Sequence, residues 1–146
     1  MIVVDVKNMQ RKQAVDSTRI EDLGVRALRT IGREGAQLSI VVVNDRRIRE
    51  LNRLYRGRDS ATDVLAFSQQ EGDGAGVHTE VMGDVVISAE TAARQAAEAG
   101  DTLENELDLL AVHGILHLAG FDHVGKASEK AEMERWTRKI LGGRRG

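Results

Sequence analysis

Residues 38–57 read LSIVVVNDRRIRELNRLYRG and hold the clearest structural pattern in the chain. The first six residues form an apolar run whose β-branched side chains are typical of a buried strand. Asn44 or Asp45 then caps a helix, because a short polar side chain there accepts hydrogen bonds from free backbone N–H groups. Gly57 ends this helix. A strand that leads straight into an amphipathic helix indicates a layered fold. The predicted inward face of the helix consists of Ile48, Leu51, Leu54 and Tyr55.

Three further strands and four further helices surround this segment. The strands are short apolar runs, and the helices show apolar residues at intervals of three and four. Thr18 and Glu21 have the spacing of a capping box at the first helix. Strands separated by helices predict an α+β fold, with a single layer of four-stranded mixed sheet packed with about five helices. The additional strands are expected at 2–6, 63–67 and 81–88, and the additional helices at 18–33, 89–99, 102–118 and 127–141.

The composition bounds the class of protein. A chain of 146 residues suits a single domain, residues 1–146, with one functional site. Hydrophobic residues at 41% and charged residues at 30% are close to globular averages, which disfavours disordered and coiled-coil classes. The absence of cysteine excludes disulfides, thiolate metal ligands and cysteine nucleophiles. No run approaches the roughly 18 apolar residues of a membrane span, and no signal peptide is evident, so we expect a cytoplasmic protein.

Charge is unevenly distributed, although the net charge is only -2. Residues 46–58 hold six arginines against one glutamate, a local charge of +5, whereas residues 71–110 hold ten acidic residues against one arginine, a local charge of -9. A basic stretch of this size suits a phosphate-bearing partner, and a solvated helix face without any partner would also produce it. Aromatic residues make up only 3%, so a nucleic acid would be bound through its backbone rather than by base stacking.

Three of the four histidines lie in the segment HGILHLAGFDH, residues 113–123. His113 and His117 are one helical turn apart, so their imidazoles share one face and can bind one ion. Gly120 can adopt the left-handed conformation that ends a helix, which would let His123 turn back toward the same ion. Three imidazoles leave a fourth tetrahedral position open for water, as in catalytic zinc sites. The sequence therefore predicts one zinc ion on this helix and the turn after it.

The same histidines could instead be satisfied core or capping residues, but three at this spacing favour a metal site. The spacing is also that of the metzincin proteases, in which a glutamate after the first histidine serves as general base. Gly114 occupies that position, so a peptidase is disfavoured while metal binding is not. Asp122 could either accept a hydrogen bond from a ligating imidazole or cap the turn.

These motifs resemble the YbeY family of bacterial endoribonucleases and rRNA maturation factors. HGILHLAGFDH is similar to the family signature without a gap, and LNRLYRGRDSATDVLAFS and MGDVVIS resemble two further family stretches. The resemblance covers roughly residues 38–141. The chain departs from the family at Ala61 and Ser68, where prolines are usual, and at Ala66, where serine is common. None of these departures touches a histidine.

The resemblance implies metal-dependent cleavage of single-stranded RNA, with a role in 16S rRNA 3′-end maturation and ribosome quality control. The partners that it implies are single-stranded rRNA and the small ribosomal subunit, and of the possible oligomeric states the monomer is favoured. Arg56 and His113 are the expected catalytic residues. From the charge contrast, the basic helix end is expected to lie along one wall of the metal cleft, with the acidic helices mostly elsewhere. Arg53 and Arg58 are expected to contact the RNA backbone beside Arg56. The zinc ligands that the resemblance implies are His113, His117 and His123.

Two other functions are compatible with these residues. The zinc could be structural, in a non-catalytic rRNA-binding maturation factor. A hydrolase of small phosphate or amide substrates could share only the three-histidine site. Attack by water and attack by the ribose 2′-OH both agree with the motifs.

Overall fold

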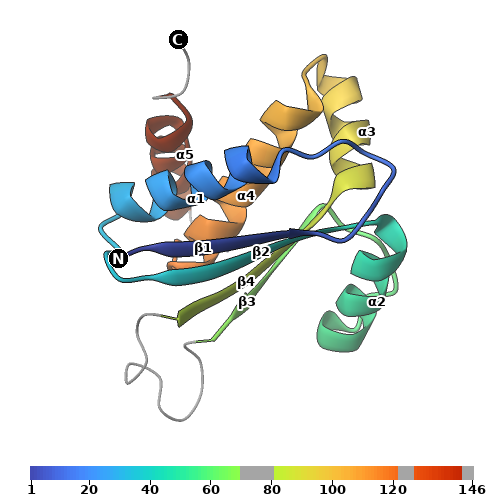
Figure 1. Cartoon of the computed structure of the whole chain (residues 1–146), viewed down its shortest axis with the longest axis horizontal. Coiled ribbons are helices and arrows are strands. Elements are labelled where there is room, and N and C mark those ends of the chain that lie inside the picture. The colour runs from blue at the N-terminus through green and yellow to red at the C-terminus, as the bar shows by residue number, and fades with distance from the viewer. Residues whose placement is uncertain (70–80, 122–126, 143–146) are drawn as a thin grey trace.

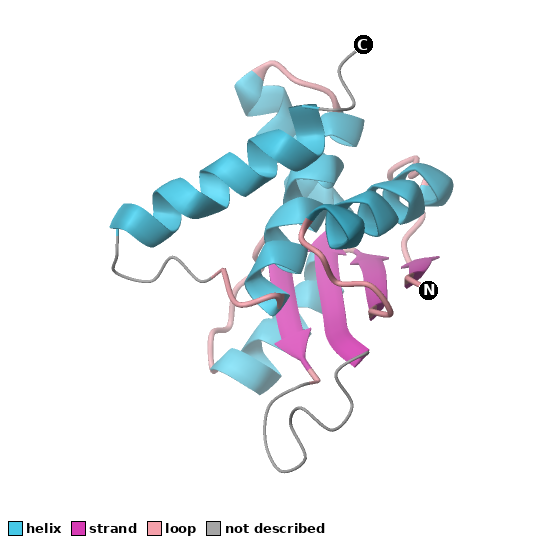
Figure 2. Cartoon of the chain, turned by 90° about the vertical axis from the view of Figure 1, so that its left-hand side faces the viewer, coloured by secondary structure: helices cyan, strands magenta, loops and turns pink. Residues whose placement is uncertain are grey.

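The structure is a computed structural model that describes residues 1–69, 81–121 and 127–142. Within these ranges it contains one mixed sheet and five helices, which confirms the expected α+β fold (Figures 1 and 2). Each element lies within a few residues of its predicted range. The strands are β1 (Val3–Asn8), β2 (Gln37–Val43), β3 (Val64–Ser68) and β4 (Val81–Ser88). The helices are α1 (Ser17–Thr30), α2 (Asp45–Arg56), α3 (Ala89–Ala99), α4 (Leu103–Leu118) and α5 (Ala127–Gly142).

The sheet has the strand order β1-β2-β4-β3. β2 pairs in parallel with β1 and with β4, whereas β3 runs antiparallel to β4 at the edge. Parallel neighbours need a crossover connection, which α1 supplies between β1 and β2. β3 begins where β4 ends, and the backbone N–H of Ser88 donates to the carbonyl of Asp63 at 2.9 Å. Asp63 therefore lies at the edge of the sheet where α3 starts.

The helix ends follow local capping chemistry, with one correction at α1. The cap of α1 is Asp16, whose side chain accepts a hydrogen bond from the backbone N–H of Arg19 at 3.1 Å. The predicted capping box of Thr18 and Glu21 is wrong, because an aspartate is the stronger cap and its charge suits the positive end of the helix. The expected cap on α2 is confirmed as Asn44, and Ser88 and Thr102 cap α3 and α4 in the same way.

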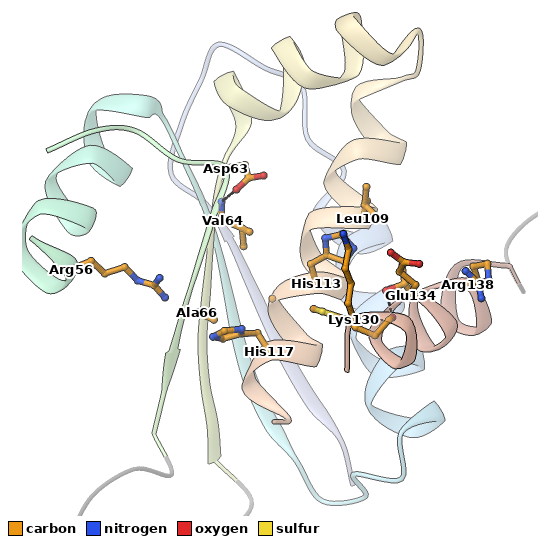
Figure 3. Close-up of a pocket in the computed structure, with 13 residues that line it drawn as sticks. Arg56, Asp63, Val64, Ala66, Leu109, His113, His117, Lys130, Glu134 and Arg138 are labelled. Carbon is orange, nitrogen blue, oxygen red and sulfur yellow. Dashed lines mark hydrogen bonds between the residues drawn. The ribbon is translucent and has the colours of Figure 1, made fainter. Parts of the chain in front are cut away.

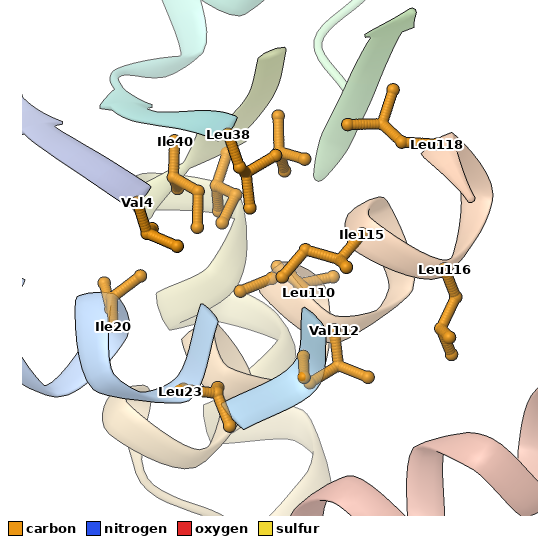
Figure 4. Packing of buried hydrophobic residues seen from close by; sticks show 14 of the residues in the cluster. Val4, Ile20, Leu23, Leu38, Ile40, Leu110, Val112, Ile115, Leu116 and Leu118 are labelled. Atoms are coloured by element: carbon orange, nitrogen blue, oxygen red, sulfur yellow. The ribbon is translucent and has the colours of Figure 1, made fainter. Parts of the chain in front are cut away.

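The sheet separates two hydrophobic clusters of unequal size. α1 and α4 cover one face and build the main core with side chains such as Ile20, Ile40 and Ile115 (Figure 4). α4 also packs against α3 and α5, so it is buried around most of its circumference. On the opposite face of the sheet, α2 contributes Ile48 to a small cluster with Val43, Leu65 and Val86. α4 is therefore the central helix of the fold, whereas α2 buries only a few side chains against the sheet.

α2 is more exposed than the sequence predicts. Ile48 is fully buried and Leu51 is half-buried, as expected. Leu54 and Tyr55 are 61% and 68% exposed, so their assignment to the inward face is wrong. The small cluster on this side of the sheet accommodates only the first turns of the helix, and the Tyr55 ring instead contacts Phe67 edge-on, with 5.3 Å between ring centroids.

The start of α2 is joined to α3 by hydrogen bonds around Asp45. Its carboxylate accepts from the hydroxyls of Ser88 and Thr91, each at 2.6 Å, and pairs with Arg94 at 2.9 Å. Burial acts to raise the pKa of Asp45, but these donors outweigh it and leave the pKa below its ordinary value. The ionised carboxylate thus stabilises this junction.

α5 packs on the outer side of α4. Met133 and Ile140 are buried and Trp136 is partly buried. The Trp136 ring lies 5.7 Å from that of Phe121, just after α4, and Arg26 of α1 donates to the carbonyl of Ile140 at 3.0 Å. None of the helices described is long and apolar enough to cross a membrane.

Candidate active site

A cavity of about 670 Å³ lies between four elements of the fold (Figure 3). The end of α2, the start of β3, one face of α4 and one face of α5 all contribute to its lining. The α4 face consists of Leu109, His113 and His117, which are four residues apart, together with Gly114. The helical period therefore directs both described histidines of the predicted metal site into one cavity, as the sequence requires.

Gly114 explains how the histidine face is held against the sheet. A Cβ atom at this position would lie 2.5 Å from Cγ1 of Val85 on β4, far inside normal contact. Val85 is fully buried, so it has little room to move. The close approach of α4 and β4 therefore requires glycine. A glutamate of the metzincin type could not be accommodated here, which is a further argument against a peptidase.

The end of α4 has the turn that the predicted third ligand needs. Gly120 has a φ of +93°, and its N–H donates to the carbonyl of His117 at 3.1 Å. The N–H of Phe121 donates to the carbonyl of Leu116 at 2.9 Å, which completes a Schellman motif. His123 and Asp122 lie outside the described residues. Within the described ranges, no three side chains of His, Cys, Asp or Glu gather as a metal cluster, so the three-histidine site stays a prediction.

Arg56 is the member of the basic stretch that reaches the cavity. It occupies the last turn of α2, which Gly57 ends with a φ of +69°. Arg53 and Arg58 are exposed but do not line the cavity. Two other arginines of this stretch are paired, Arg47 with Glu50 and Arg49 with Asp59. The structure therefore brings Arg56 together with His113 and His117, and leaves Arg53 and Arg58 outside.

Asp63 is a lining residue that the sequence analysis did not single out. Its Oδ1 accepts from the backbone N–H of Val64 at 2.8 Å, and its Oδ2 accepts from Nε2 of Gln95 at 3.3 Å. These donors hold a half-buried carboxylate just before the N-terminal end of β3. In the sequence, the only sign of a functional role for Asp63 was its position between the basic helix and the strand. An aspartate that merely caps a turn would occupy the same position.

The α5 wall was also missed. Lys130, Glu134 and Arg138 line the cavity at intervals of four residues, with Met133 and Thr137 beneath them. In the sequence this pattern is indistinguishable from a solvated helix face. Whether these side chains face solvent or a cavity depends on the packing of α5 beside α4, and this packing is a tertiary contact.

The described part of the acidic stretch, residues 81–110, faces elsewhere, as expected of the acidic helices. Among residues 81–110, only Leu109 lines the cavity. Glu106 lies with Asp101 and Asp108 in a separate depression, where burial raises the pKa of Glu106 and the charges of Asp63 and Asp101 add to the rise. Among the described residues, the carboxylates at the main cavity are Asp63 and Glu134, against three cations, Arg56, Lys130 and Arg138. The cavity is therefore mildly basic.

The fold and the cavity define a class: an α+β protein in which two imidazoles of a central helix face a cavity with cations on two walls, an arrangement that suits an anionic substrate. Comparison with known proteins identifies the particular family. The family model described as "Endoribonuclease YbeY" matches residues 5–144, and the chain belongs to this family.

Relatives and a solved structure agree with this assignment. The chain is 40% identical over 131 residues to endoribonuclease YbeY of Syntrophotalea carbinolica, covering 90% of this chain and 87% of the relative. It is 45% identical over 143 residues to that of Pelotomaculum thermopropionicum, covering 94% and 93%. The solution structure of a Thermotoga maritima protein superimposes with a TM-score of 0.63 at 25% identity, covering 97% of this chain and 91% of that one. The family resemblance noted in the motifs is thus confirmed.

Proposed function

We propose that this chain is an endoribonuclease that cleaves single-stranded RNA with a bound zinc ion, in 16S rRNA 3′-end maturation and ribosome quality control. The observation that carries the proposal is that Arg56 lines the same cavity as His113 and His117, although α2 and α4 are distant in the sequence. The relatives are named endoribonucleases, which supports RNA as the substrate class. rRNA maturation would make this a cytoplasmic protein, acting as a monomer on the small ribosomal subunit.

In this proposal, His113, His117 and His123 hold the zinc ion. The donor chemistry suits it, because two described imidazoles line one cavity one turn apart and the chain turns directly after α4. Neutral imidazoles without thiolates are ligands that zinc accepts in catalytic sites. When bound, zinc lowers the pKa of a coordinated water and polarises a phosphoryl oxygen.

Arg56 binds and stabilises the scissile phosphate. A guanidinium can donate two parallel hydrogen bonds to phosphate oxygens, and these strengthen as charge develops in the transition state. Arg56 is exposed and has no ion-pair partner in the described part of the chain, so no carboxylate of that part competes with a phosphate for it. Arg53 and Arg58 contact the RNA backbone outside the cavity. Gly114 keeps the histidine face close to the sheet and thereby fixes the floor on which the phosphate is oriented.

A single strand suits this cavity better than a duplex. No Phe, Tyr or Trp ring lines it among the described residues, so recognition depends on the path of the phosphates more than on base identity. The catalytic groups lie within a cavity rather than on a flat surface, which a rigid duplex would enter poorly. Cleavage therefore falls as salt rises, through loss of phosphate contacts.

The test compares Arg56→Ala with Arg46→Ala, an exposed arginine at the other end of α2 that does not line the cavity. The substrate is a labelled rRNA 3′-end precursor, and metal content and circular dichroism are measured in parallel. Arg56→Ala should keep metal and fold but lose cleavage by about 100-fold or more, whereas Arg46→Ala stays near wild type.

Two outcomes would overturn the proposal. Wild-type cleavage by a folded Arg56→Ala variant would remove Arg56 from the reaction and leave a structural role. Salt-independent turnover of a chromogenic phosphodiester, with no RNA cleavage by the wild-type protein, would make this a small-substrate hydrolase.

A further inference from the structure

The cavity wall on α5 carries charges that the proposed reaction does not use. Lys130, Glu134 and Arg138 lie on one face of α5, each four residues from the next, and all three are exposed at the cavity. In Figure 3, Arg56 reaches in from one side, Arg138 comes from the other, and the histidines lie between them. Cations therefore flank the histidine floor on two walls.

No carboxylate of the described residues pairs with either of the two α5 cations. In the described part of the chain, neither Lys130 nor Arg138 is within 4.0 Å of a carboxylate, although Glu134 lies one turn from each. By contrast, Arg19 on α1 is fully engaged with Asp108 at 2.8 Å. Cations left unpaired beside a cavity are available to an anionic ligand.

The position of this wall is set by packing rather than by the charges themselves. Met133 and Thr137, on the same face, are buried at the base of the cavity. Trp136 packs against Phe121 beyond the end of α4, and the carbonyl of Ile140 accepts from Arg26. Lys130 and Arg138 are thus presented from a helix that is anchored along its length.

We propose that α5 forms the second wall of the RNA-binding track, with Lys130 and Arg138 contacting phosphates that flank the one bound by Arg56. Eight residues of helix separate these cations by about 12 Å, so they contact different phosphates of one strand. Glu134, between them, repels a phosphate and confines such contacts to the two ends of the wall. This inference rests on the proposed function and adds the path of the strand across the cavity.

A track that uses both walls distinguishes a polynucleotide from a small phosphate ester. A strand that crosses the cavity engages Arg56 and α5 together, whereas a dinucleotide is too short to reach both ends of α5. Loss of the α5 cations should therefore weaken long substrates more than short ones. Each phosphate contact to a single strand also adds about 0.7 to the slope of log affinity against log salt, so removal of two contacts flattens the slope by about 1.4.

The experiment compares the double variant Lys130→Ala/Arg138→Ala with Arg135→Ala. Arg135 is an exposed arginine of α5 that does not line the cavity, so it controls for charge on the same helix. Binding of a single-stranded DNA dodecamer is measured by fluorescence anisotropy over a salt series, because this probe offers phosphates without depending on RNA cleavage. Cleavage of an RNA dodecamer and of a dinucleotide is measured alongside, with thermal unfolding as the check on fold.

The double variant should bind the dodecamer about tenfold more weakly, with a flatter salt slope. At subsaturating substrate it should cleave the dodecamer about tenfold more slowly, whereas dinucleotide turnover, which does not need both ends of α5, should change much less. Arg135→Ala should match wild type. Equal affinities and salt slopes for the double variant and Arg135→Ala would overturn the α5 track. If the wild-type protein cleaves no RNA but the double variant still loses DNA binding, the proposed function fails and the track stands.

Discussion

α4 and α2 each bring chemistry to the same cavity, but they are held in the fold very differently. α4 is buried on nearly all sides and meets the sheet so closely that only glycine fits at position 114. α2 buries Ile48 and Asn52 and leaves its arginines, Leu54 and Tyr55 exposed. The imidazoles thus come from the most constrained helix of the molecule, and the guanidinium comes from one of the least constrained.

This difference suits the two tasks in the proposed reaction. Metal ligands must be fixed to within a fraction of an ångström, which requires a packed scaffold. A phosphate-binding arginine has a long side chain and tolerates more freedom, provided that its helix end is in place. Substitutions in α4 should therefore affect metal and stability strongly, and substitutions in α2 should act through its few anchors.

The largest effect is expected at the histidine face. His117→Ala should lose nearly all bound metal and all cleavage, because two imidazoles do not make a zinc site. His78→Ala is the control, since this histidine lies outside the cluster in the sequence. Metal is measured by elemental analysis after dialysis. Equal loss of metal in the two variants would contradict the three-histidine assignment.

The next effect tests how tightly α4 is packed. Gly114→Ala should lower the free energy of unfolding by about 1–3 kcal/mol, because the new methyl overlaps Val85. Urea unfolding measures the loss, and a double-mutant cycle with Val85→Ala assigns it to this contact. If Gly114→Ala costs as much in the Val85→Ala background as in wild type, the overlap is not its cause.

A smaller effect is expected at the buried anchor of α2. Nδ2 of Asn52, in a residue only 4% exposed, donates to the carbonyl of Ser60 at 2.9 Å. Asn52→Ala should cost about 1–2 kcal/mol, because the carbonyl loses its donor. Leu54→Ala, on the exposed side of the same helix, should change stability by less than about 0.5 kcal/mol. Equal costs in urea unfolding would mean that α2 is anchored elsewhere.

The smallest effect concerns the α2–α3 junction and depends on pH. The pKa of Asp45 is lower in the folded protein than its ordinary value of 3.8, so its carboxylate stabilises the fold above that pH and loses this effect as pH falls through the folded pKa. Asp45→Asn should therefore melt below wild type near neutral pH, and the gap should close below about pH 3.8. A gap in melting temperature that is constant from neutral to acidic pH would show that the charge of Asp45 is not involved.

The sequence by itself determined the order of the elements, most of the helix caps and the shared face of His113 and His117. These are local properties, since a strand alternates every second residue, a helix repeats every 3.6, and a cap acts within one turn. Even the left-handed conformation of Gly120 follows from its place after the last helical residue. The error at Thr18 was also local, because Asp16 was a better cap within the same turn.

Only the tertiary structure decided what each helix face meets. Leu54 and Tyr55 follow the apolar period of α2 but are exposed, because burial needs a partner and the small cluster beneath α2 ends before them. In the sequence, Lys130 and Arg138 have the pattern of a solvated helix face. They line the cavity of the histidines only because α5 packs beside α4. Periodicity specifies a face, whereas the opposing surface comes from residues far away in the chain, which no local pattern encodes.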